Sequence, residues 1–488
     1  MEQVKKFSFD VGWVFVSSAV TLLIGFLLRV ILARWLGATD LGLYQMVVTI
    51  YGIGTLVATF GIGVALIKYV AEYKDDQDKL TQTVSSGLIS SVIFGILTSI
   101  FLYALSGTLA NVFHMPELAR LLRILAVVFP FTCILEAWLG LFNGLREMKT
   151  FTFLMILRSL LTILLTIAFV KLGFGIEGAV FAIPLSVFAG SVVGFFLSRA
   201  FLRLNLRGFI DNAKRLVSFG GQVFGANAVN LIANQADIIL IGYFLAAKDV
   251  GYYSIAVNVS MVLPLLPSAI QRITFPATSE YWSKNNHQAL QTMIDKSMKY
   301  SACIMLPLGL GVGFFSDAII TAIFGEEFIY AVLPLCVLLV ARVIRGGTIV
   351  PIGGSFGAIG RPDLALKVAA ISAATNVGLD IVLIPRFGIL GAAIATTISL
   401  LLQTVVYLIL VAKIMIVKID RRWFARAIGF GVVAAALFLV GSNLINHYIA
   451  GGVILSAYVV LVLNLFLTRE DKDTFRSLAG ALVSRKRI

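Results

Sequence analysis

The chain has 488 residues, of which 59% are hydrophobic and only 13% charged, and its mean hydropathy is +0.97. Soluble domains carry about a quarter charged residues, so this composition excludes an ordinary soluble protein and predicts that lipid surrounds most of the fold. The net charge of +14 does not indicate nucleic-acid binding, because the basic residues lie in short loops between apolar runs. Cys133, Cys303 and Cys336 lie inside apolar runs without metal-ligand spacing and are expected to be structural.

Fourteen apolar runs are long enough to cross a bilayer as helices, since a core of about 30 Å requires about 20 residues. The first run is too long for a signal peptide and is expected to be a retained span. All the runs are continuously apolar, which favours helices over barrel strands. In chain order they centre on residues 11–36, 41–67, 84–106, 118–145, 151–171, 176–201, 215–246, 250–278, 298–323, 328–356, 364–384, 388–415, 424–446 and 451–468.

The basic residues predict the orientation of these spans. One set of alternate loops holds 28 Lys and Arg residues, whereas the other holds four: Arg34, Lys171, Lys248 and Arg386. Because cytoplasmic loops carry an excess of positive charge, both termini are expected in the cytoplasm.

Two segments occur twice at nearly the same offset. LGATDLGLYQMVVTI at 36–50 returns as LAAKDVGYYSIAVNV at 245–259, and FGIEGAVFAIPLS at 174–186 returns as FGILGAAIATTIS at 387–399. The offsets of 209 and 213 residues cover six predicted spans, so both copies run in the same direction through the membrane. The sequence therefore predicts an all-α polytopic membrane protein in which two parallel six-helix bundles, 1–210 and 211–420, flank a central cleft. Two extra helices and a tail, 421–488, follow.

Arginines within the predicted spans mark a candidate binding site, since each charge costs roughly 2.5–3.5 kcal/mol to insert. Arg342 and Arg345 are the strongest candidates for an anionic ligand, because they lie three residues apart and share one helix face. Three further candidates lie in other spans: Arg29, Arg158 and Arg272. Arg120 and Arg123 lie at a span end and can snorkel to the interface.

The alternative for each arginine is an ion pair between helices. Three carboxylates lie clearly within spans and are available for such pairs: Glu136, Asp237 and Asp380. Three carboxylates cannot neutralise seven arginines, so an excess of positive charge is expected in the cleft.

The seventh predicted span carries a polar stripe at helical spacing: Asn227, Asn230, Asn234 and Asp237. The first span, its repeat partner, carries Ser18, Thr21, Gly25 and Arg29 on one face. Both stripes are expected to line the cleft, although hydrogen bonding between helices of one bundle is the alternative. Asp237 is also a candidate site for a coupling cation, either Na+ or H+.

The sequence contains no nucleotide-binding, protease or hydrolase motif and no long extramembrane segment, so an enzyme, a metal site and a resident cofactor are not expected. A parallel repeat around a cleft is typical of transporters that use an ion gradient or the gradient of the substrate itself. The glycine- and proline-rich run 345–362, together with Pro264, Pro267 and Pro276, predicts hinges or ordinary helix kinks.

Several segments occur in an order that resembles one known family. LGATDLGLYQMVVTIYGIG, FGIGVALIKYVAEY, KDVGYYSIAV, FPATSEYW, GAIGRPDLALKVAAIS and GILGAAIATTIS, spread over residues 7–410, are similar to the polysaccharide-exporting branch of the multidrug/oligosaccharidyl-lipid/polysaccharide (MOP) superfamily. The resemblance implies a cell-membrane flippase with fourteen spans and a cationic cavity. It would move an oligosaccharide on a polyprenyl phosphate or diphosphate to the outer leaflet for polysaccharide biosynthesis. Its partners would be this lipid-linked oligosaccharide, membrane lipids and the polymerase or glycosyltransferases of the pathway.

Three alternatives remain at this point. A multidrug exporter of the same superfamily would need an acidic, aromatic cavity for cationic substrates, and the excess of arginine counts against it. A lipid II flippase is the second alternative; in that branch the two extra spans contribute a lipid-binding groove. The third is a passive membrane scaffold, which the repeat and the buried charges disfavour.

Overall fold

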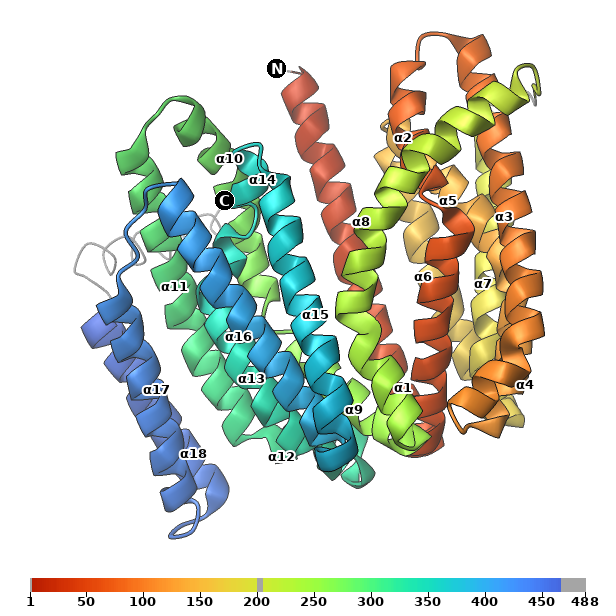
Figure 1. The fold of residues 1–488 in the computed structure, drawn as a ribbon. Coiled ribbons are helices and arrows are strands. Elements are labelled where there is room, and N and C mark those ends of the chain that lie inside the picture. Colours follow the sequence, from red (N-terminus) through yellow and green to blue (C-terminus); the bar gives the residue numbers. More distant parts are fainter. Residues whose placement is uncertain (1, 200–204, 467–488) are drawn as a thin grey trace, which may run out of the picture. The chain divides into compact units, whose positions relative to one another are not determined.

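Figure 1 shows a computed structural model of the chain, which describes residues 2–199 and 205–466. Within these ranges every regular element is a helix and no strand occurs. Among the described residues, eight helical stretches are long and apolar enough to cross a membrane, and the number rises to twelve if each of four bent helix pairs forms one span. The prediction of an all-helical, multi-pass membrane protein is therefore confirmed, whereas the exact number of spans stays a prediction.

The chain divides into two compact units. The first contains the described residues up to Ser254, with Ile323–Phe328 and Val377–Ala392; the second contains Ile255–Ala322, Ile329–Asn376 and the described residues from Ala393 onward. The helices of the first unit are α1 (Glu2–Thr59), α2 (Ile62–Glu72), α3 (Gln77–Val112), α4 (Pro116–Ala126), α5 (Val128–Gly144), α6 (Met148–Phe169), η1 (Val170–Phe174), α7 (Gly175–Ser198) and α8 (Phe209–Phe244). The elements shared between the units are α9 (Ala247–Ser260), α12 (Ser316–Phe324), η2 (Glu326–Ala331), α15 (Pro362–Phe387) and α16 (Ile389–Ile414). The second unit adds α10 (Leu265–Ser283), α11 (His287–Phe314), α13 (Val332–Gly347), η3 (Val350–Ile352), α14 (Ser355–Ala358), α17 (Arg421–Gly441), α18 (His447–Leu461) and η4 (Val462–Phe466).

Helix α1 contains the first predicted span and most of the second, and is broken at Gly37. The backbone there has φ 80° and ψ −175°, a left-handed conformation that glycine adopts without a Cβ penalty. The amide of Ala38, freed by the break, donates to Glu327 Oε1 at 3.2 Å, and Arg34 Nε donates to the carbonyl of Ile323 at 2.8 Å. A segment almost 300 residues away in the sequence thus caps the second half of α1.

The second duplicated segment begins with the same backbone conformation in both copies. Gly175 opens α7 with φ 54°, and its counterpart Gly388, which directly precedes α16, has φ 60°. The duplication therefore preserves a left-handed glycine at the start of a predicted span, where any other residue would be strained.

Helix α5 is the most enclosed helix of the first unit, with most of its residues buried. It approaches α2 closely because both helices carry glycine at the contact: a Cβ on Gly140 would lie 2.6 Å from the carbonyl oxygen of Gly63. Its Trp138 is 3% exposed, and the indole nitrogen donates to the carbonyl of Ser191 on α7 at 3.1 Å. These contacts fix α5 between α2 and α7.

In the second unit, glycines let α11 and α13 pack closely. A Cβ on Gly346 would lie 2.4 Å from Met305 Cε, and a Cβ on Gly347 would lie 3.0 Å from the Ala302 backbone. Ser301 Oγ donates to the carbonyl of Gly346 at 2.7 Å. After Gly347 the glycine- and proline-rich run forms only η3 and α14, so the predicted interruption occurs there.

The appended helices α17 and α18 contact α11 at two places. Near the middle of α11, Lys299 Nζ lies 3.1 Å from Asp420 Oδ2, and Asp420 also caps α17 by accepting from the Trp423 amide at 3.0 Å. This amide, together with Lys299, lowers the pKa of the Asp420 carboxyl.

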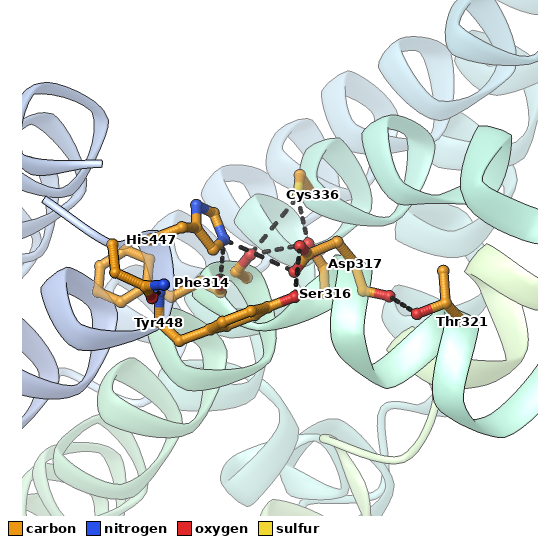
Figure 2. Close-up of polar contacts among 9 residues, drawn as sticks. Phe314, Ser316, Asp317, Thr321, Cys336, His447 and Tyr448 are labelled. Atoms are coloured by element: carbon orange, nitrogen blue, oxygen red, sulfur yellow. Dashed lines mark hydrogen bonds and ion pairs between the residues drawn. The ribbon is translucent and has the colours of Figure 1, made fainter. Parts of the chain in front are cut away.

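At the C-terminal end of α11, His447 contacts Phe314 and Asp317, and we refer to these contacts as the His447 clasp (Figure 2). Its Nε2 lies 3.0 Å from the carbonyl oxygen of Phe314 and 3.6 Å from the Asp317 carboxylate. Tyr448 donates to the same carboxylate at 3.3 Å, and the Phe314 ring stacks on Phe438 of α17 at 4.1 Å between centroids. The clasp thus joins both appended helices to the rest of the second unit.

We expect His447→Phe to loosen this clasp, because phenylalanine keeps the ring against Phe438 but cannot donate to the Phe314 carbonyl. The loss should be about 1 kcal/mol, the net value of one hydrogen bond. Faster limited proteolysis in the turn 442–446 would report it. Tyr448→Phe, which removes only a longer and more exposed bond, should change cleavage less; equal effects of the two variants would contradict this role of His447.

Candidate functional site

The two copies of the first duplicated segment meet in the first unit. A Cβ on Gly42 would overlap the carbonyl oxygen of Ala247, and a Cβ on Gly251 would overlap the carbonyl oxygen of Ala38. Gly42 and Gly251 are equivalent in the repeat, as are Ala38 and Ala247, so the contact is reciprocal. Helices α1 and α9 therefore cross backbone to backbone at a point where both copies need glycine.

The segment Ile323–Phe328 packs beside this crossing. Phe324 and Phe328 are each 1% exposed; the Phe324 ring lies 5.9 Å from Phe26 of α1, and the Phe328 ring lies 6.0 Å from Tyr252 of α9. With the Glu327 carboxylate on the Ala38 amide, this segment contacts both helices at their crossing. We refer to Gly42, Gly251 and Ile323–Phe328 as the crossing cluster.

The residues behind the crossing differ between the two copies. In the first copy Arg29 interacts electrostatically with the buried Tyr44. In the second copy the equivalent tyrosine, Tyr253, donates a hydrogen bond to Asp237 Oδ2. Two copies of one segment thus place a tyrosine beside a cation in one half and beside a carboxylate in the other.

Asp237 also faces a second carboxylate, Asp380 of α15. Asp380 is fully buried, a side-chain interaction links it to Asp237, and neither of its oxygens accepts a hydrogen bond from another described residue. Two ionised carboxylates have no hydrogen atom to share and repel each other in a low-dielectric interior. A proton or a metal cation between the two carboxylates would remove this repulsion. The sequence identified Asp237 as a cation candidate but treated Asp380 only as a partner for arginine.

Several arginines have partners in the first unit. Arg158 of α6 interacts electrostatically with the half-buried Glu136 of α5, as the ion-pair alternative anticipates. Arg120 forms an ion pair with Glu177 at 2.7 Å, and Arg123 Nε donates to Ser106 Oγ at 3.2 Å. These contacts hold helices together.

Arg342 and Arg345 lie in the last turns of α13, in the second unit. Arg342 is 8% exposed, and the Arg345 guanidinium is close enough to that of Arg342 for the two charges to interact. The Nε atom of Arg345 is buried without a hydrogen-bond partner among the described residues. Two like charges held together in an apolar helix bundle create an environment that favours a bound anion.

The remaining candidates are spread over two helices. Asn227 and Asn234 are exposed on α8, whose parts Phe209–Val229 and Asn234–Phe244 are inclined by 60°, and Arg272 is exposed on α10. The side chain of Asn230 lies outside the described residues. The structure thus groups Arg29, Arg158 and the α8 residues in the first unit, and Arg272, Arg342 and Arg345 in the second.

Sequence reasoning did not locate a groove of about 330 Å³ in the second unit, formed by α11, α13 and α17. Its lining is almost wholly apolar and includes Leu310, Val343 and Val432. The groove lies along α11 between the Lys299–Asp420 tie and the His447 clasp. Its shape and chemistry suit a hydrocarbon chain. No cluster of three or more metal-ligating His, Cys, Asp or Glu side chains occurs in the part of the chain that the structure describes.

Comparison with solved structures shows which known fold the chain shares. Over 95% of its length the chain superposes on 99% of the lipid II flippase MurJ in an inward closed conformation, with a TM-score of 0.75 and 16% sequence identity. It also matches an inward-facing multidrug resistance MATE transporter of the MOP superfamily over 81% of this chain and 94% of that one, with a TM-score of 0.69 and 18% identity. The fold is therefore that of MOP-superfamily membrane transporters.

The sequence comparison then defines the family. The family profile described as "Polysaccharide biosynthesis protein" matches residues 31–333, more than half of the chain, and the chain belongs to this family. Among its relatives, the "Probable low-salt glycan biosynthesis flippase Agl15" of Haloferax volcanii is 27% identical over 77% of both chains. The resemblance read from the sequence segments is confirmed.

Proposed function

We propose that this protein is a flippase that moves a lipid-linked oligosaccharide, carried on a polyprenyl phosphate or diphosphate, from the cytoplasmic to the outer leaflet. Membership of the polysaccharide biosynthesis family and the flippase relative support this function. The observation that carries it is the closely spaced pair of Arg342, which is buried, and Arg345, whose Nε atom is buried, because planar guanidinium groups bind phosphate oxygens in a bidentate manner. Translocation by alternating access involves no covalent chemistry, so the protein is not an enzyme.

The proposed topology has fourteen spans. Twelve candidates follow from length and composition, and two of them, Gly12–Thr59 and Met148–Ser198, contain 48 and 51 residues, enough for two crossings each. Both contain glycines with left-handed backbone, at Gly37 and at Gly173 and Gly175. Counting each as two gives fourteen, arranged as lobes 1–210 and 211–420 with an appended pair and both termini in the cytoplasm.

The two parts of the substrate have different requirements, and the second unit offers a feature for each. The phosphate groups bind at Arg342 and Arg345, whereas the polyprenyl chain lies in the apolar groove of α11, α13 and α17. This assignment agrees with the lining of the groove and with its position on the appended helix α17. The crossing cluster closes one side of the membrane and opens when the substrate is released.

Flipping can be tested with purified protein in liposomes that contain a labelled polyprenyl-diphosphate oligosaccharide. Protein-dependent transfer of the sugar to the opposite leaflet, measured with an impermeant glycosidase, is expected. Parallel liposomes with lipid II or with a cationic dye distinguish the two alternatives of the same superfamily. Dye transport without transfer of any lipid-linked sugar would exclude the proposed function. Transfer of lipid II alone would show that the protein is a lipid II flippase instead.

The Asp237–Asp380 pair is the proposed site of the coupling cation. In Asp380→Asn the amide can donate to Asp237 without an added proton or Na+, so stimulation of flipping by an imposed H+ or Na+ gradient should disappear. Exchange of substrate without a gradient should persist. Tyr253→Phe is the matched control, because it removes a neighbouring hydrogen bond but keeps both carboxylates. Undiminished gradient dependence in Asp380→Asn would rule the pair out.

A further inference from the structure

The first unit contains a second groove that the proposed function does not use. It has a volume of about 640 Å³ and lies among α3, α5 and α7, with Leu88, Phe131 and Val192 in its lining. This volume falls within the range of about 300–1,000 Å³ that is typical of small-molecule sites. Phe195 and Phe196, along its edge, are 45% and 57% exposed, so the groove is accessible from the surface of this unit.

The polar residues Trp138, Ser191 and Ser198 in the groove wall use their donors in hydrogen bonds within the protein. The Trp138 indole donates to the Ser191 carbonyl, so it presents no free donor. The hydroxyls of Ser191 and Ser198 donate at 2.8 Å to the carbonyls of Phe188 and Phe195 in their own helix. The indole and the two hydroxyls therefore have internal partners, and hydrocarbon can lie against this part of the groove without leaving these donors unpaired.

One end of the groove carries a positive charge. The Arg199 guanidinium lies over the rings of Phe195 and Phe196, with its central carbon 5.1 and 4.7 Å from their centroids. The described chain resumes in contact with α3, where the Asn205 amide donates to Ser85 Oγ at 3.1 Å, one turn from Leu88. Arg207, which is exposed, lies in this segment. No ion pair of Arg199 is found among the described residues.

We propose that this groove is a binding site for an anionic glycerophospholipid, distinct from the transported lipid. The acyl chains occupy the apolar wall, and the phosphate lies against Arg199 at the C-terminal end of α7. Charge complementarity favours this occupant, because an apolar groove that ends in a guanidinium held on two aromatic rings matches a lipid with a negative headgroup. In the orientation proposed above, the lipid belongs to the cytoplasmic leaflet. Binding would strengthen the contacts among α3, α5 and α7.

Native mass spectrometry of the detergent-purified full chain can test this site with dioleoyl phosphatidylglycerol and dioleoyl phosphatidylcholine. The two lipids have identical chains and a phosphate, but the choline ammonium cancels the charge. We expect the wild type to retain phosphatidylglycerol preferentially. Arg199→Gln should reduce the preference roughly fivefold, since one basic residue near an anionic surface contributes about that factor. Lys214→Gln, an exposed cation outside the groove lining, should leave it unchanged.

Val192→Trp provides a second readout by filling the groove, and should reduce binding of both lipids. Equal reduction by Arg199→Gln and Lys214→Gln would overturn the site in favour of diffuse charge attraction, as would a wild type without preference. If Val192→Trp slows flipping but leaves phosphatidylglycerol binding intact, the groove holds the transported lipid instead, which also overturns the proposal. Lipid retention does not depend on flipping, so this test and the test of the proposed function can fail separately.

Discussion

Gly42→Ala and Gly251→Ala are each expected to open the crossing of α1 and α9. The added Cβ meets a backbone carbonyl rather than a flexible side chain, so the helices themselves must separate. Overpacking of this kind costs about 1–3 kcal/mol. If the crossing closes one side of the transporter, the cost applies to only one of its two states. A shift of about 1.4 kcal/mol changes the populations tenfold.

A cysteine at Leu41 can report this shift, because Leu41 is only 1% exposed beside the crossing. In a background without Cys133, Cys303 and Cys336, we expect reaction of Leu41→Cys with an impermeant maleimide to become about tenfold faster in either glycine variant. Substrate flipping should slow in parallel. The double variant should gain less than the product of the two effects, since one separation relieves both overlaps.

Gly107→Ala in α3 is the matched control. A Cβ at Gly107 has no neighbouring atom within 4 Å, and alanine favours the helix by up to about 1 kcal/mol. Maleimide reactivity and flipping should therefore match the wild type. Unchanged reactivity in Gly42→Ala and Gly251→Ala would mean that the crossing stays closed throughout the cycle and is not a gate.

Around the break in α1, the sequence predicts the helices themselves better than the contacts between distant segments. Apolar run lengths predict membrane helices because the bilayer sets their length. The prediction that the first apolar runs form separate spans agrees with the break at Gly37. The cap that Glu327 provides was not predictable, since only the packed fold brings it to Ala38.

The same distinction applies to the charged residues. Counting arginines and carboxylates predicts an excess of positive charge, and it lists Glu136 among the partners that Arg158 could find. It does not predict that two carboxylates, Asp237 and Asp380, interact with each other. Pairing depends on which helix faces point inward, and hydropathy in a protein that is apolar on all sides carries little information about that.

Arg345→Gln is expected to reduce flipping and to raise the thermal stability of the protein without substrate. The substitution removes a half-buried charge that repels Arg342 and whose buried Nε lacks a partner among the described residues, so the folded state should gain about 1–3 kcal/mol. It also removes a charge-assisted contact to phosphate, which is worth about 1.5–3 kcal/mol and corresponds to a loss of binding of roughly ten- to hundredfold. Opposite changes in stability and function are characteristic of a binding residue rather than a structural one.

Arg345→Lys separates charge from geometry. Lysine restores the positive charge but not the planar, bidentate donor set, so flipping should recover only in part. Arg120→Gln serves as the control, because Arg120 is exposed and paired with Glu177; it should cost at most about 1 kcal/mol of stability and leave flipping unchanged. If Arg345→Gln instead lowers the melting temperature and the residual flipping scales with the folded fraction, Arg345 is a structural residue. The phosphate site would then have to be sought among the other arginines of the chain.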